Sequence, residues 1–510
     1  MNANARNVAD ESVIRVVGAA ANNLRNVTVD LPKKALTVVT GVSGSGKSSL
    51  VLDTVAAEAQ RLVNDSYPSF VRNRLLHMPA PEAQRVKIVR HLGSALTDLT
   101  YVFDEPSTGL HPADVRRLNQ LLLKLRDAGN TVLVVEHHPQ VIRVADHVVD
   151  MGPGAGSEGG LVRFEGTPEE LRASDTLTGR LLSTPLELRR EVREPRGRVR
   201  VERASAHNLT GFDVDVPIGV LTAVTGVAGS GKSSFAVDEL PRQHREFTVV
   251  GQDPLRGGVR SMSLSVLGVA DGVREAFAAV SGLEPSWFSF NSKGACPACR
   301  GKGHITTELA FLDDVATPCD ACGGERFNPT TLKAELDGHT IADVLRMSAG
   351  PVADLFAGRP GIAGPMRWLE RVGLGYTAVG QSLDTLSGGE KQRLLLARHL
   401  SAAASASGAG SGFGSGFAEE RIVLDEPTTG LHPSDVERLD VLFADLVDAG
   451  ATLVVVEHNL RVVARADHVI DIGPGAGADG GRLLFAGPPA ELAQREDSLT
   501  GRALAEAAKG

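Results

Sequence analysis

Two glycine-rich segments carry the residue types that bind a chain of phosphates. They read GVSGSGKS at 41–48 and GVAGSGKS at 226–233, and both fit the pattern GxxxxGK[ST]. In such a loop the backbone N–H groups cradle phosphate oxygens, the lysine reaches the β- and γ-phosphates, and the serine can ligate Mg²⁺. A β-like apolar run precedes each loop (36–40 and 221–225) and a helix-like segment follows it, as the motif requires. The predicted ATP contacts are Gly41, Ser43, Gly44, Gly46, Lys47 and Ser48 in the first loop and Gly226, Gly229, Gly231, Lys232 and Ser233 in the second.

An Asp-Glu pair follows a second apolar run in each half of the chain. The pairs are Asp104-Glu105 and Asp425-Glu426. Each aspartate would help to hold Mg²⁺, and each glutamate would act as the catalytic residue that positions or polarises the attacking water. A carboxylate that only caps a helix is the alternative, and it fits poorly because Pro-(Ser/Thr)-Thr-Gly follows both pairs. Together with the phosphate loops, the pairs predict ATP hydrolysis.

Four cysteines form a pattern that is typical of a metal site. Cys296, Cys299, Cys319 and Cys322 have the spacing CxxC-x19-CxxC, and glycines follow each pair. These glycines allow a tight turn in which backbone N–H groups bond to the thiolates. Four thiolates at this spacing suit a closed, tetrahedral Zn²⁺ site of the structural type. Redox or disulfide use is the weaker alternative.

The motifs occur twice along the chain, but their spacing differs between the two halves. The phosphate loops are 185 residues apart, whereas the Asp-Glu pairs and the Val-Glu-His segments at 135–137 and 456–458 are 321 apart. The second half therefore carries 136 extra residues (321 − 185) between loop and Asp-Glu pair. We predict a first domain at 1–185, a solvated linker at 186–200 and a second domain at 201–510. The second domain would include a zinc module at about 288–330, a helical region at about 331–400 and a flexible Ala/Ser/Gly loop at 401–417.

Composition narrows the functional class. Hydrophobic residues make up 42% and charged residues 23%, which is ordinary for a globular protein. No apolar run approaches the ~18 residues of a membrane helix, so we predict a soluble cytoplasmic protein without a membrane partner. The formal charge of −9 argues against general binding to polyanions, so any nucleic-acid surface must be a local patch.

The segment LSGGEKQR at 386–393 resembles the signature of ABC-type ATPases. The resemblance implies an α/β fold of tandem ABC-type P-loop NTPase domains with an inserted zinc-binding module. It also implies that Ser387, Gly388 and Gly389 contact an ATP γ-phosphate held by the phosphate loop of another domain. Two glycines and a following helix N-terminus suit such an anion.

Further ABC motifs are implied by the same resemblance. His137 and His458 match the switch histidine that senses the γ-phosphate, and Gln252 matches the Q-loop glutamine. The first half has Met78-Pro79-Ala80-Pro81 where a signature should stand, and it has no Q-loop, because Gln60 sits in a helix-like run.

The zinc module with Phe290-Asn291 before it, the LSGGEKQR segment and both Asp-Glu-Pro…Gly-Leu-His segments resemble the UvrA family of the bacterial DNA-repair excinuclease. The resemblance covers nearly the whole chain, which looks most like short UvrA-like proteins associated with resistance to DNA-acting drugs. It implies a homodimer that hydrolyses ATP and binds distorted duplex DNA in nucleotide excision repair or drug tolerance. UvrB is a doubtful partner, because the region that holds the UvrB-binding and insertion domains is absent.

Two arginines are candidate DNA contacts. In the family a basic DNA-facing segment follows the Q-loop, and Arg256 and Arg260 occupy that place here. A solvated loop is an equal alternative, because the following residues, 261–264, depart from the family's Ser-Asn-Pro-Ala.

Pairing the halves head to tail predicts a lopsided enzyme. The first phosphate loop would receive the signature at 387–389 and hydrolyse ATP slowly. The second loop would face 78–81, bind ATP and turn over poorly. A non-catalytic ATP- and DNA-binding protein is one alternative. An ABC ATPase that acts on ribosomes or serves a transporter is another, and the zinc module speaks against it.

Overall fold

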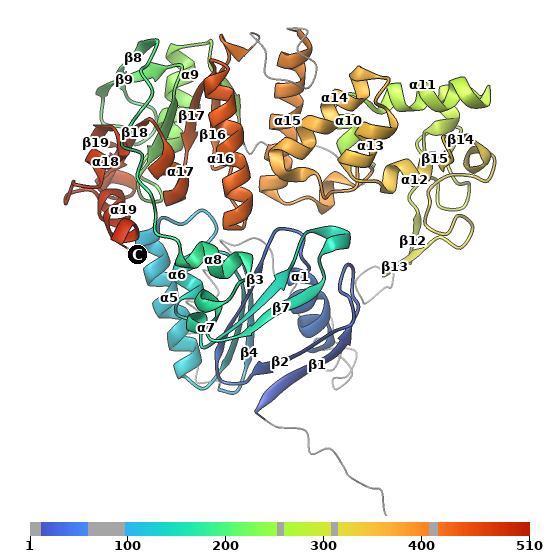
Figure 1. Cartoon of the computed structure of the whole chain (residues 1–510), viewed down its shortest axis with the longest axis horizontal. Helices are drawn as coiled ribbons and strands as arrows, with labels where there is room; N and C mark the ends of the chain where they lie inside the picture. Colours follow the sequence, from blue (N-terminus) through green and yellow to red (C-terminus); the bar gives the residue numbers. More distant parts are fainter. Residues whose placement is uncertain (1–11, 60–96, 252–259, 308–314, 407–416, 510) are drawn as a thin grey trace, which may run out of the picture. The chain divides into compact units, whose positions relative to one another are not determined.

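The computed structural model describes residues 12–59, 97–251, 260–307, 315–406 and 417–509 (Figure 1). Two compact units make up the chain. The first contains the chain up to Leu186, the segment Gly430–Asp435 and the C-terminal residues from Glu506. The second contains Glu187–Thr429 and Val436–Ala505.

A five-stranded sheet organises the first unit, in the order β4-β5-β3-β6-β7. Its strands are β3 (Leu36–Gly41), β4 (Thr100–Asp104), β5 (Thr131–Val135), β6 (His147–Gly152) and β7 (Leu161–Gly166). The first four strands of that order are parallel, and β7 is antiparallel to β6. Every residue of β3 and β5 is buried, as expected for parallel strands covered on both faces. The strand predicted before the first phosphate loop is therefore confirmed.

The second unit repeats this sheet with one strand more, in the order β11-β16-β17-β10-β18-β19. Its strands are β10 (Leu221–Thr225), β11 (Thr248–Val250), β16 (Arg421–Asp425), β17 (Thr452–Val456), β18 (His468–Gly473) and β19 (Arg482–Gly487). The added edge strand β11 ends two residues before Gln252. Within the described residues the first sheet has no counterpart of β11, and the predicted lack of a Q-loop in the first half concerns residues outside the described ranges.

A hairpin and a set of helices complete each sheet. The hairpins are β1 (Val13–Ala19) with β2 (Val27–Pro32), and β8 (Gly197–Ala204) with β9 (Phe212–Ile218). Among the described residues, the first unit has the helices α1 (Lys47–Leu50), α5 (Pro112–Asp127), α6 (Pro139–Ile142), α7 (Pro168–Ala173) and α8 (Leu177–Ser183). In the second half α16 (Pro433–Asp448), α17 (Leu460–Arg465), α18 (Pro489–Leu492) and α19 (Leu499–Lys509) correspond to α5, α6, α7 and α8, and α9 (Leu240–Gln243) follows the second phosphate loop.

Helix α5 shows why these helices cover a sheet. Val115, Leu118, Leu122 and Leu125 recur every three or four residues, which places them on one face of the helix. All four are buried, together with apolar residues of β3 and β5 in one core cluster. The opposite face carries charged residues such as Arg117.

The extra residues of the second half form an insertion between β11 and β16. It contains α10 (Ser263–Val266), α11 (Ala270–Ser281), β12 (His304–Thr307), β13 (Val315–Pro318), β14 (Glu335–Leu336), β15 (His339–Thr340), α12 (Ile341–Arg346), α13 (Ala349–Leu355), α14 (Pro360–Leu369) and α15 (Gly388–Ala406). In Figure 1 these elements lie to one side of the six-stranded sheet, and α15 is the one beside it. The signature segment stands at the start of α15.

The segment predicted to be a solvated linker is tied to the second unit. Asp467 is 4% exposed, and its carboxylate forms ion pairs with Arg189 (2.5 Å) and Arg193 (3.2 Å). Asp467 also accepts a hydrogen bond from the backbone of Leu221, at the start of β10. The prediction of a solvated segment was wrong for these arginines, because a buried carboxylate needs cationic partners.

The predicted loop at 401–417 begins later than expected. Helix α15 continues to Ala406, and Ser401 and Ala404 are buried on it. Alanine has the highest helix propensity, so an Ala-rich start extends the helix rather than ending it. At the other end Phe417 is fully buried, with its ring centroid 5.7 Å from that of Trp368. Residues 407–416 lie outside the described part.

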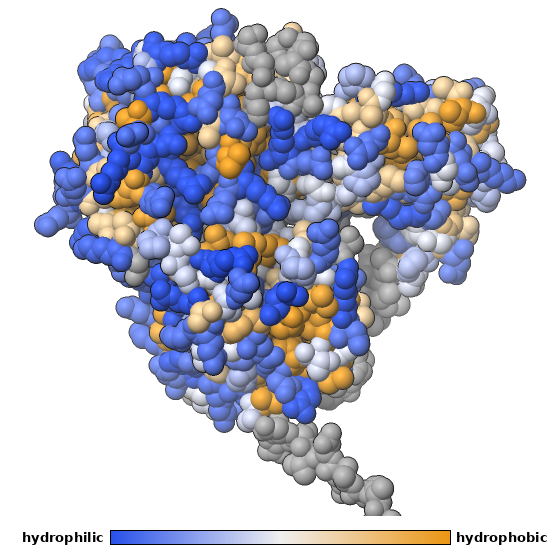
Figure 2. Space-filling model, viewed as in Figure 1, coloured by the Kyte–Doolittle hydropathy of each residue, from blue (hydrophilic) through white to orange (hydrophobic). Residues whose placement is uncertain are grey.

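No helix in the described ranges is long and apolar enough to cross a membrane. The face drawn in Figure 2 is mostly hydrophilic, with apolar residues in separate groups. The most exposed large apolar side chains, Val17, Val280 and Val441, stand on three different elements.

Candidate nucleotide sites and metal centre

The first phosphate loop has the curled backbone that its motif predicts. Gly41, Gly44 and Gly46 have φ angles of 132°, 73° and 102°, a region that glycine adopts without steric cost. A Cβ on Gly41 would lie 2.0 Å from the carbonyl oxygen of Met151, so only glycine fits there. The Nζ of Lys47 donates to the carbonyl oxygen of Val42 at 2.8 Å, across the loop.

The second phosphate loop has the same geometry. Gly226, Gly229 and Gly231 have φ angles of 136°, 73° and 105°. The Nζ of Lys232 donates to the carbonyl oxygen of Val227 at 2.9 Å. Ser48 and Ser233, the predicted Mg²⁺ ligands, are both exposed at the loop ends. Both loops therefore have the geometry of a phosphate cradle.

An asparagine that sequence reasoning did not single out supports each loop from the preceding hairpin. The Nδ2 of Asn23 donates to the carbonyl oxygen of Gly44 at 2.9 Å. The Nδ2 of Asn208 donates to the carbonyl oxygens of Gly229 (3.2 Å) and Gly477 (3.1 Å). The dipeptide Asn-Leu occurs before both loops, at 23–24 and at 208–209, and this repeat was the available signal, but the contacts of the asparagines span up to 269 residues.

The two Asp-Glu pairs stand at the ends of equivalent strands in the two sheets. Asp104 ends β4 and Asp425 ends β16, and the Oγ of Ser233 donates to Asp425 at 3.2 Å. Burial raises the pKa of Asp104 to about 6, and the charge of Glu105 adds to this effect. A bound Mg²⁺ would favour the charged carboxylate and reverse the shift. Asp104 and Asp425, with the serine of each phosphate loop, are therefore suited to hold Mg²⁺ bound with ATP.

Each glutamate predicted to be catalytic has a strained backbone and faces the histidine predicted to be the switch. Glu105 and Glu426 have φ angles of 45° and 51°, which is uncommon outside glycine and is often found at functional sites. The Oε1 of Glu105 lies 3.4 Å from the Nε2 of His137. Burial acts to raise the pKa of Glu105, but the hydrogen bond and charge of His137 outweigh it and lower the pKa. The contact with His137 thus favours the charged form of Glu105.

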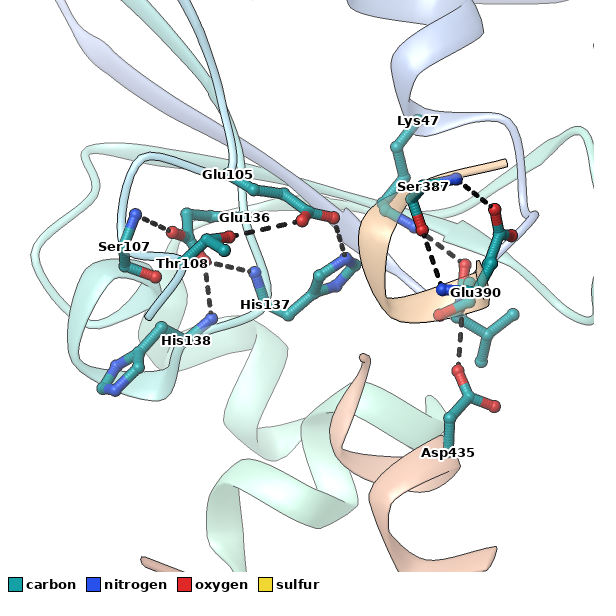
Figure 3. A network of polar contacts seen from close by, with 12 residues as sticks. Lys47, Glu105, Ser107, Thr108, Glu136, His137, His138, Ser387, Glu390 and Asp435 are labelled. Carbon is teal, nitrogen blue, oxygen red and sulfur yellow. Dashed lines mark hydrogen bonds and ion pairs between the residues drawn. The ribbon is translucent and has the colours of Figure 1, made fainter. Parts of the chain in front are cut away.

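A second glutamate, which sequence reasoning did not single out, directly precedes each predicted switch histidine. Glu136 and Glu457 are each 2% exposed. Burial raises the pKa of Glu457 to about 7, although hydrogen bonds from Thr428 and Asn459 oppose this shift. Figure 3 shows Glu136 beside Glu105 and His137.

The signature segment begins a capped helix. The backbone N–H of Ser387 donates to the Glu390 carboxylate at 2.8 Å, and the Ser387 hydroxyl accepts from the Glu390 N–H at 3.2 Å (Figure 3). Ser387 and Gly388 are exposed, and a Cβ on Gly388 would meet nothing within 4 Å. Gly389 is buried, and a Cβ there would lie 2.6 Å from the Thr429 carbonyl oxygen. The first two residues are therefore open to a ligand, and the third fixes the segment to the chain after Glu426.

The four cysteines meet as predicted. Their sulfur atoms all lie within 4.8 Å of one another, and none forms a disulfide. The backbone N–H of Gly303 donates to the sulfur of Cys299 at 3.2 Å. Burial acts to raise the pKa of Cys299, but this hydrogen bond and those of the neighbouring thiols lower it to about 7. A compact, mostly buried set of four sulfurs with backbone donors fits a structural Zn²⁺.

Several predicted residues lie outside the described ranges: Gln60, 78–81, Gln252 and Arg256. Arg260 is described, and its Nη2 donates to the carbonyl oxygen of Arg300 at 3.3 Å. Arg300 directly follows Cys299, so Arg260 stands against the cysteine cluster. The structure thus associates one candidate DNA contact with the metal centre.

Comparison with known proteins gives long matches. The chain is 40% identical over 498 residues to the UvrABC system protein A of Aquifex aeolicus, covering 90% of this chain and 52% of that protein. It is 43% identical over 458 residues to the UvrABC system protein A of Methanothermobacter thermautotrophicus, covering 83% and 46%. The chain thus spans about half the length of these relatives. No family model matches it.

Solved structures agree. The crystal structure of UvrA2 from Deinococcus radiodurans superimposes with a TM-score of 0.74 at 41% identity, covering 84% of this chain and 54% of that one. ABCE1 in a model of ribosome-bound archaeal Pelota and ABCE1 gives a TM-score of 0.50 at 16% identity, covering 95% and 80%, which supports the fold alone.

Proposed function

Because the chain is a homologue of the UvrA family with an ABC ATPase fold, we propose that it hydrolyses ATP and binds distorted duplex DNA in nucleotide excision repair. The 40% identity along 90% of the chain is the observation that carries the proposal. The two phosphate loops, each with an Asp-Glu pair and a histidine on one sheet, and the four-cysteine cluster support it.

The two ATP sites are proposed to be unequal. Lys47, Asp104, Glu105 and His137 would form one site, completed by Ser387 and its two glycines from another domain. The other site would be formed by Lys232, Asp425, Glu426 and His458. The segment that would complete it, 78–81, lacks the glycines of the LSGG motif. Removing preorganised donors at a transferring phosphoryl group lowers the rate by ~10²–10³ per donor. One site would hydrolyse ATP slowly and the other would bind it and turn over poorly.

The DNA surface is proposed to include the zinc module. Arg260 lies against Arg300 in the turn after Cys299, and Arg326 stacks over the ring of Phe290 at 5.2 Å. Arginines carried by a metal-stabilised turn can contact phosphates without ordering a flexible loop. A basic patch of this kind is compatible with a formal charge of −9 for the chain. We propose a homodimer in the cytoplasm, with UvrB a doubtful partner.

ATP hydrolysis by the purified chain tests the proposal. The rate would be measured without DNA, with intact duplex and with drug-modified duplex, for the wild type and for Glu105→Gln and Glu426→Gln. We expect the modified duplex to change the rate, and we expect Glu105→Gln to abolish hydrolysis while Glu426→Gln lowers it less. The drug-modified arm also addresses tolerance of DNA-acting drugs.

Three other results would each redirect the proposal. If the wild type binds ATP but never hydrolyses it, the chain is an ATP- and DNA-binding protein without turnover. If Glu426→Gln alone abolishes hydrolysis, the assignment of the two sites is reversed. If filter binding retains ribosomes and not duplex DNA, the DNA function is wrong.

A further inference from the structure

In each unit, one buried glutamate joins the switch histidine to the chain that follows the catalytic glutamate. The Oε1 of Glu136 accepts a hydrogen bond from the Ser107 N–H at 2.9 Å. Its Oε2 accepts from the N–H groups of His137 (2.7 Å) and His138 (2.9 Å). Figure 3 shows these three bonds leaving one carboxylate toward two segments.

Glu457 repeats the arrangement in the second unit with one bond more. Its Oε1 accepts from the N–H (3.0 Å) and the hydroxyl (2.6 Å) of Thr428. Its Oε2 accepts from the N–H groups of His458 and Asn459, both at 3.0 Å. The same bridge therefore occurs in both copies of the repeat, with a serine at 107 and a threonine at 428 as the first partner.

The bridged segments hold the two side chains that would act on the γ-phosphate. Ser107 follows Glu105 by two residues, and the Thr108 hydroxyl lies 3.4 Å from the Glu105 carboxylate. The backbone N–H of Glu105 donates to Val135, the residue just before Glu136. The chain segments that carry Glu105 and His137 are thus hydrogen-bonded to the two oxygens of the Glu136 carboxylate.

Only a carboxylate can serve both ends. It accepts at both oxygens, whereas the amide of glutamine has one accepting oxygen and an NH₂ group that donates. In Glu→Gln the NH₂ group would face backbone N–H donors on one side, and that anchor would be lost. The change is nearly isosteric, so it removes the bridge with little change in packing volume.

We propose that Glu136 and Glu457 are positioning residues that hold the switch histidine and the catalytic glutamate of their own site in the geometry that recognises the γ-phosphate. The inference rests on the proposed ATP-binding function and extends it to two residues that contact no nucleotide. It predicts that each bridge serves its own site, whichever site turns over.

The test compares four single variants of the full chain: Glu136→Gln, Glu457→Gln, Glu105→Gln and Glu426→Gln. We expect Glu136→Gln to lower kcat in the same site as Glu105→Gln but less completely, and Glu457→Gln to act in the same site as Glu426→Gln. A displacement of about 1 Å at reacting groups lowers rates by about 10²-fold. In the site that turns over, kcat should fall roughly 10- to 100-fold, and the KM for ATP should rise no more than the dissociation constant of ATP does.

A double variant separates positioning from general damage. If Glu136 acts through His137, Glu136→Gln with His137→Ala should cost no more activity than His137→Ala alone. Asp440→Asn is the matched control, because Asp440 is also a buried carboxylate (7% exposed) and lies on α16 away from these bonds. It should leave kcat unchanged.

A binding measurement keeps the inference testable without turnover. The dissociation constants of ATP and ADP would be measured for the wild type and for both glutamine variants. Since the bridge orients groups toward the γ-phosphate, the variants should lose at least about fivefold of the preference for ATP over ADP and bind ADP as the wild type does.

Different results would contradict the proposed ATPase activity and the proposed role of Glu136 and Glu457. A wild type that never hydrolyses ATP overturns the proposed ATPase, and the ATP/ADP preference then decides the inference. Unchanged kcat and unchanged ATP/ADP preference in both glutamine variants overturn the inference. So does an additive double variant, or an equal loss of ATP and ADP binding. If Glu457→Gln does not fold, Thr428→Val replaces it, because this change removes only the 2.6 Å hydrogen bond from the Thr428 hydroxyl to Glu457. Ser107→Ala is the control for Thr428→Val, because Ser107 bonds to Glu136 through its backbone N–H.

Discussion

The Nε2 of His458 lies 3.3 Å from the Oε1 of Glu426, and the corresponding atoms of His137 and Glu105 are 3.4 Å apart. The proposed catalytic glutamate and the proposed switch histidine therefore have the same geometry in both units. Within the described residues the phosphate loops also match closely. The proposed inequality between the sites therefore rests on a difference in sequence, the LSGG segment at 386–389 against Met78-Pro79-Ala80-Pro81.

Substitution of the phosphate-loop lysines tests that inequality. Both lysines are 5% exposed and occupy equivalent positions, so Lys47→Ala and Lys232→Ala remove the same cation from the two sites. We expect Lys47→Ala to reduce ATP hydrolysis by about 10²-fold or more, and Lys232→Ala to leave a measurable fraction. Steady-state hydrolysis with equilibrium ATP binding checks this. Intact hydrolysis in Lys47→Ala together with none in Lys232→Ala would show that the sites are assigned the wrong way round.

The asparagines beneath the loops should control nucleotide affinity. Asn23→Ala and Asn208→Ala each remove a donor to a loop carbonyl group, and losing such a bond typically costs about 1–2 kcal/mol. We expect ATP to bind about tenfold more weakly at the affected site, measured by calorimetric titration. Asn328→Ala is the control, because its Nδ2 donates to Lys293 in the zinc module. Wild-type affinity in both loop variants would mean that the asparagines only hold their hairpins.

The sequence was sufficient for those parts of the site whose residues are close together in the chain. The phosphate loops, the Asp-Glu strand ends and the cysteine pairs are short patterns, and the structure places each on its expected element. Parallel strands buried on both faces read as uninterrupted apolar runs, which made β3 and β10 predictable.

Long-range partners could not be predicted in the same way. Arg189 and Arg193 look like solvated charges until Asp467, more than 270 residues away, is seen to be buried between them. The roles of Asn208 and Glu457 likewise depend on which backbone groups fold against them. A hydrogen bond to the backbone leaves no pattern in the partner's side chains, so these residues appeared only as parts of a repeat.

The cysteine cluster predicts a stoichiometric metal. Four sulfurs within 4.8 Å that receive a backbone hydrogen bond should hold one Zn²⁺ per chain, measured by atomic emission on the purified protein. Cys319→Ser alters a fully buried ligand, so zinc content should fall and the melting temperature of the second unit should drop by roughly 5 °C or more. Lys302→Ala, on the exposed turn beside the cluster, should retain the metal. A metal-free wild type with full thermal stability would exclude a structural zinc.

Asp440 predicts a pH dependence of stability that is separate from catalysis. Its side chain is 4% exposed, its Oδ2 lies 3.3 Å from the Nη1 of Arg465, and burial raises its pKa to about 6 despite that arginine. A raised pKa means that the folded state holds the proton more tightly than the unfolded state does. The stabilisation is therefore complete below pH 4 and is lost as the pH rises through 6.

Asp440→Asn removes this titration. A shift of about 2 pK units corresponds to ~3 kcal/mol, so the variant should gain up to that amount of unfolding free energy relative to the wild type between pH 4 and pH 7. Urea unfolding of both proteins at the two pH values measures the difference directly, because the other carboxylates titrate equally in both. Arg465→Gln is the complementary variant. Arg465 is the cation that lowers the pKa of Asp440 most, so its removal should increase the stability that the protein loses between pH 4 and pH 7. A difference between wild type and Asp440→Asn that does not change with pH would show that Asp440 stays ionised in the folded protein.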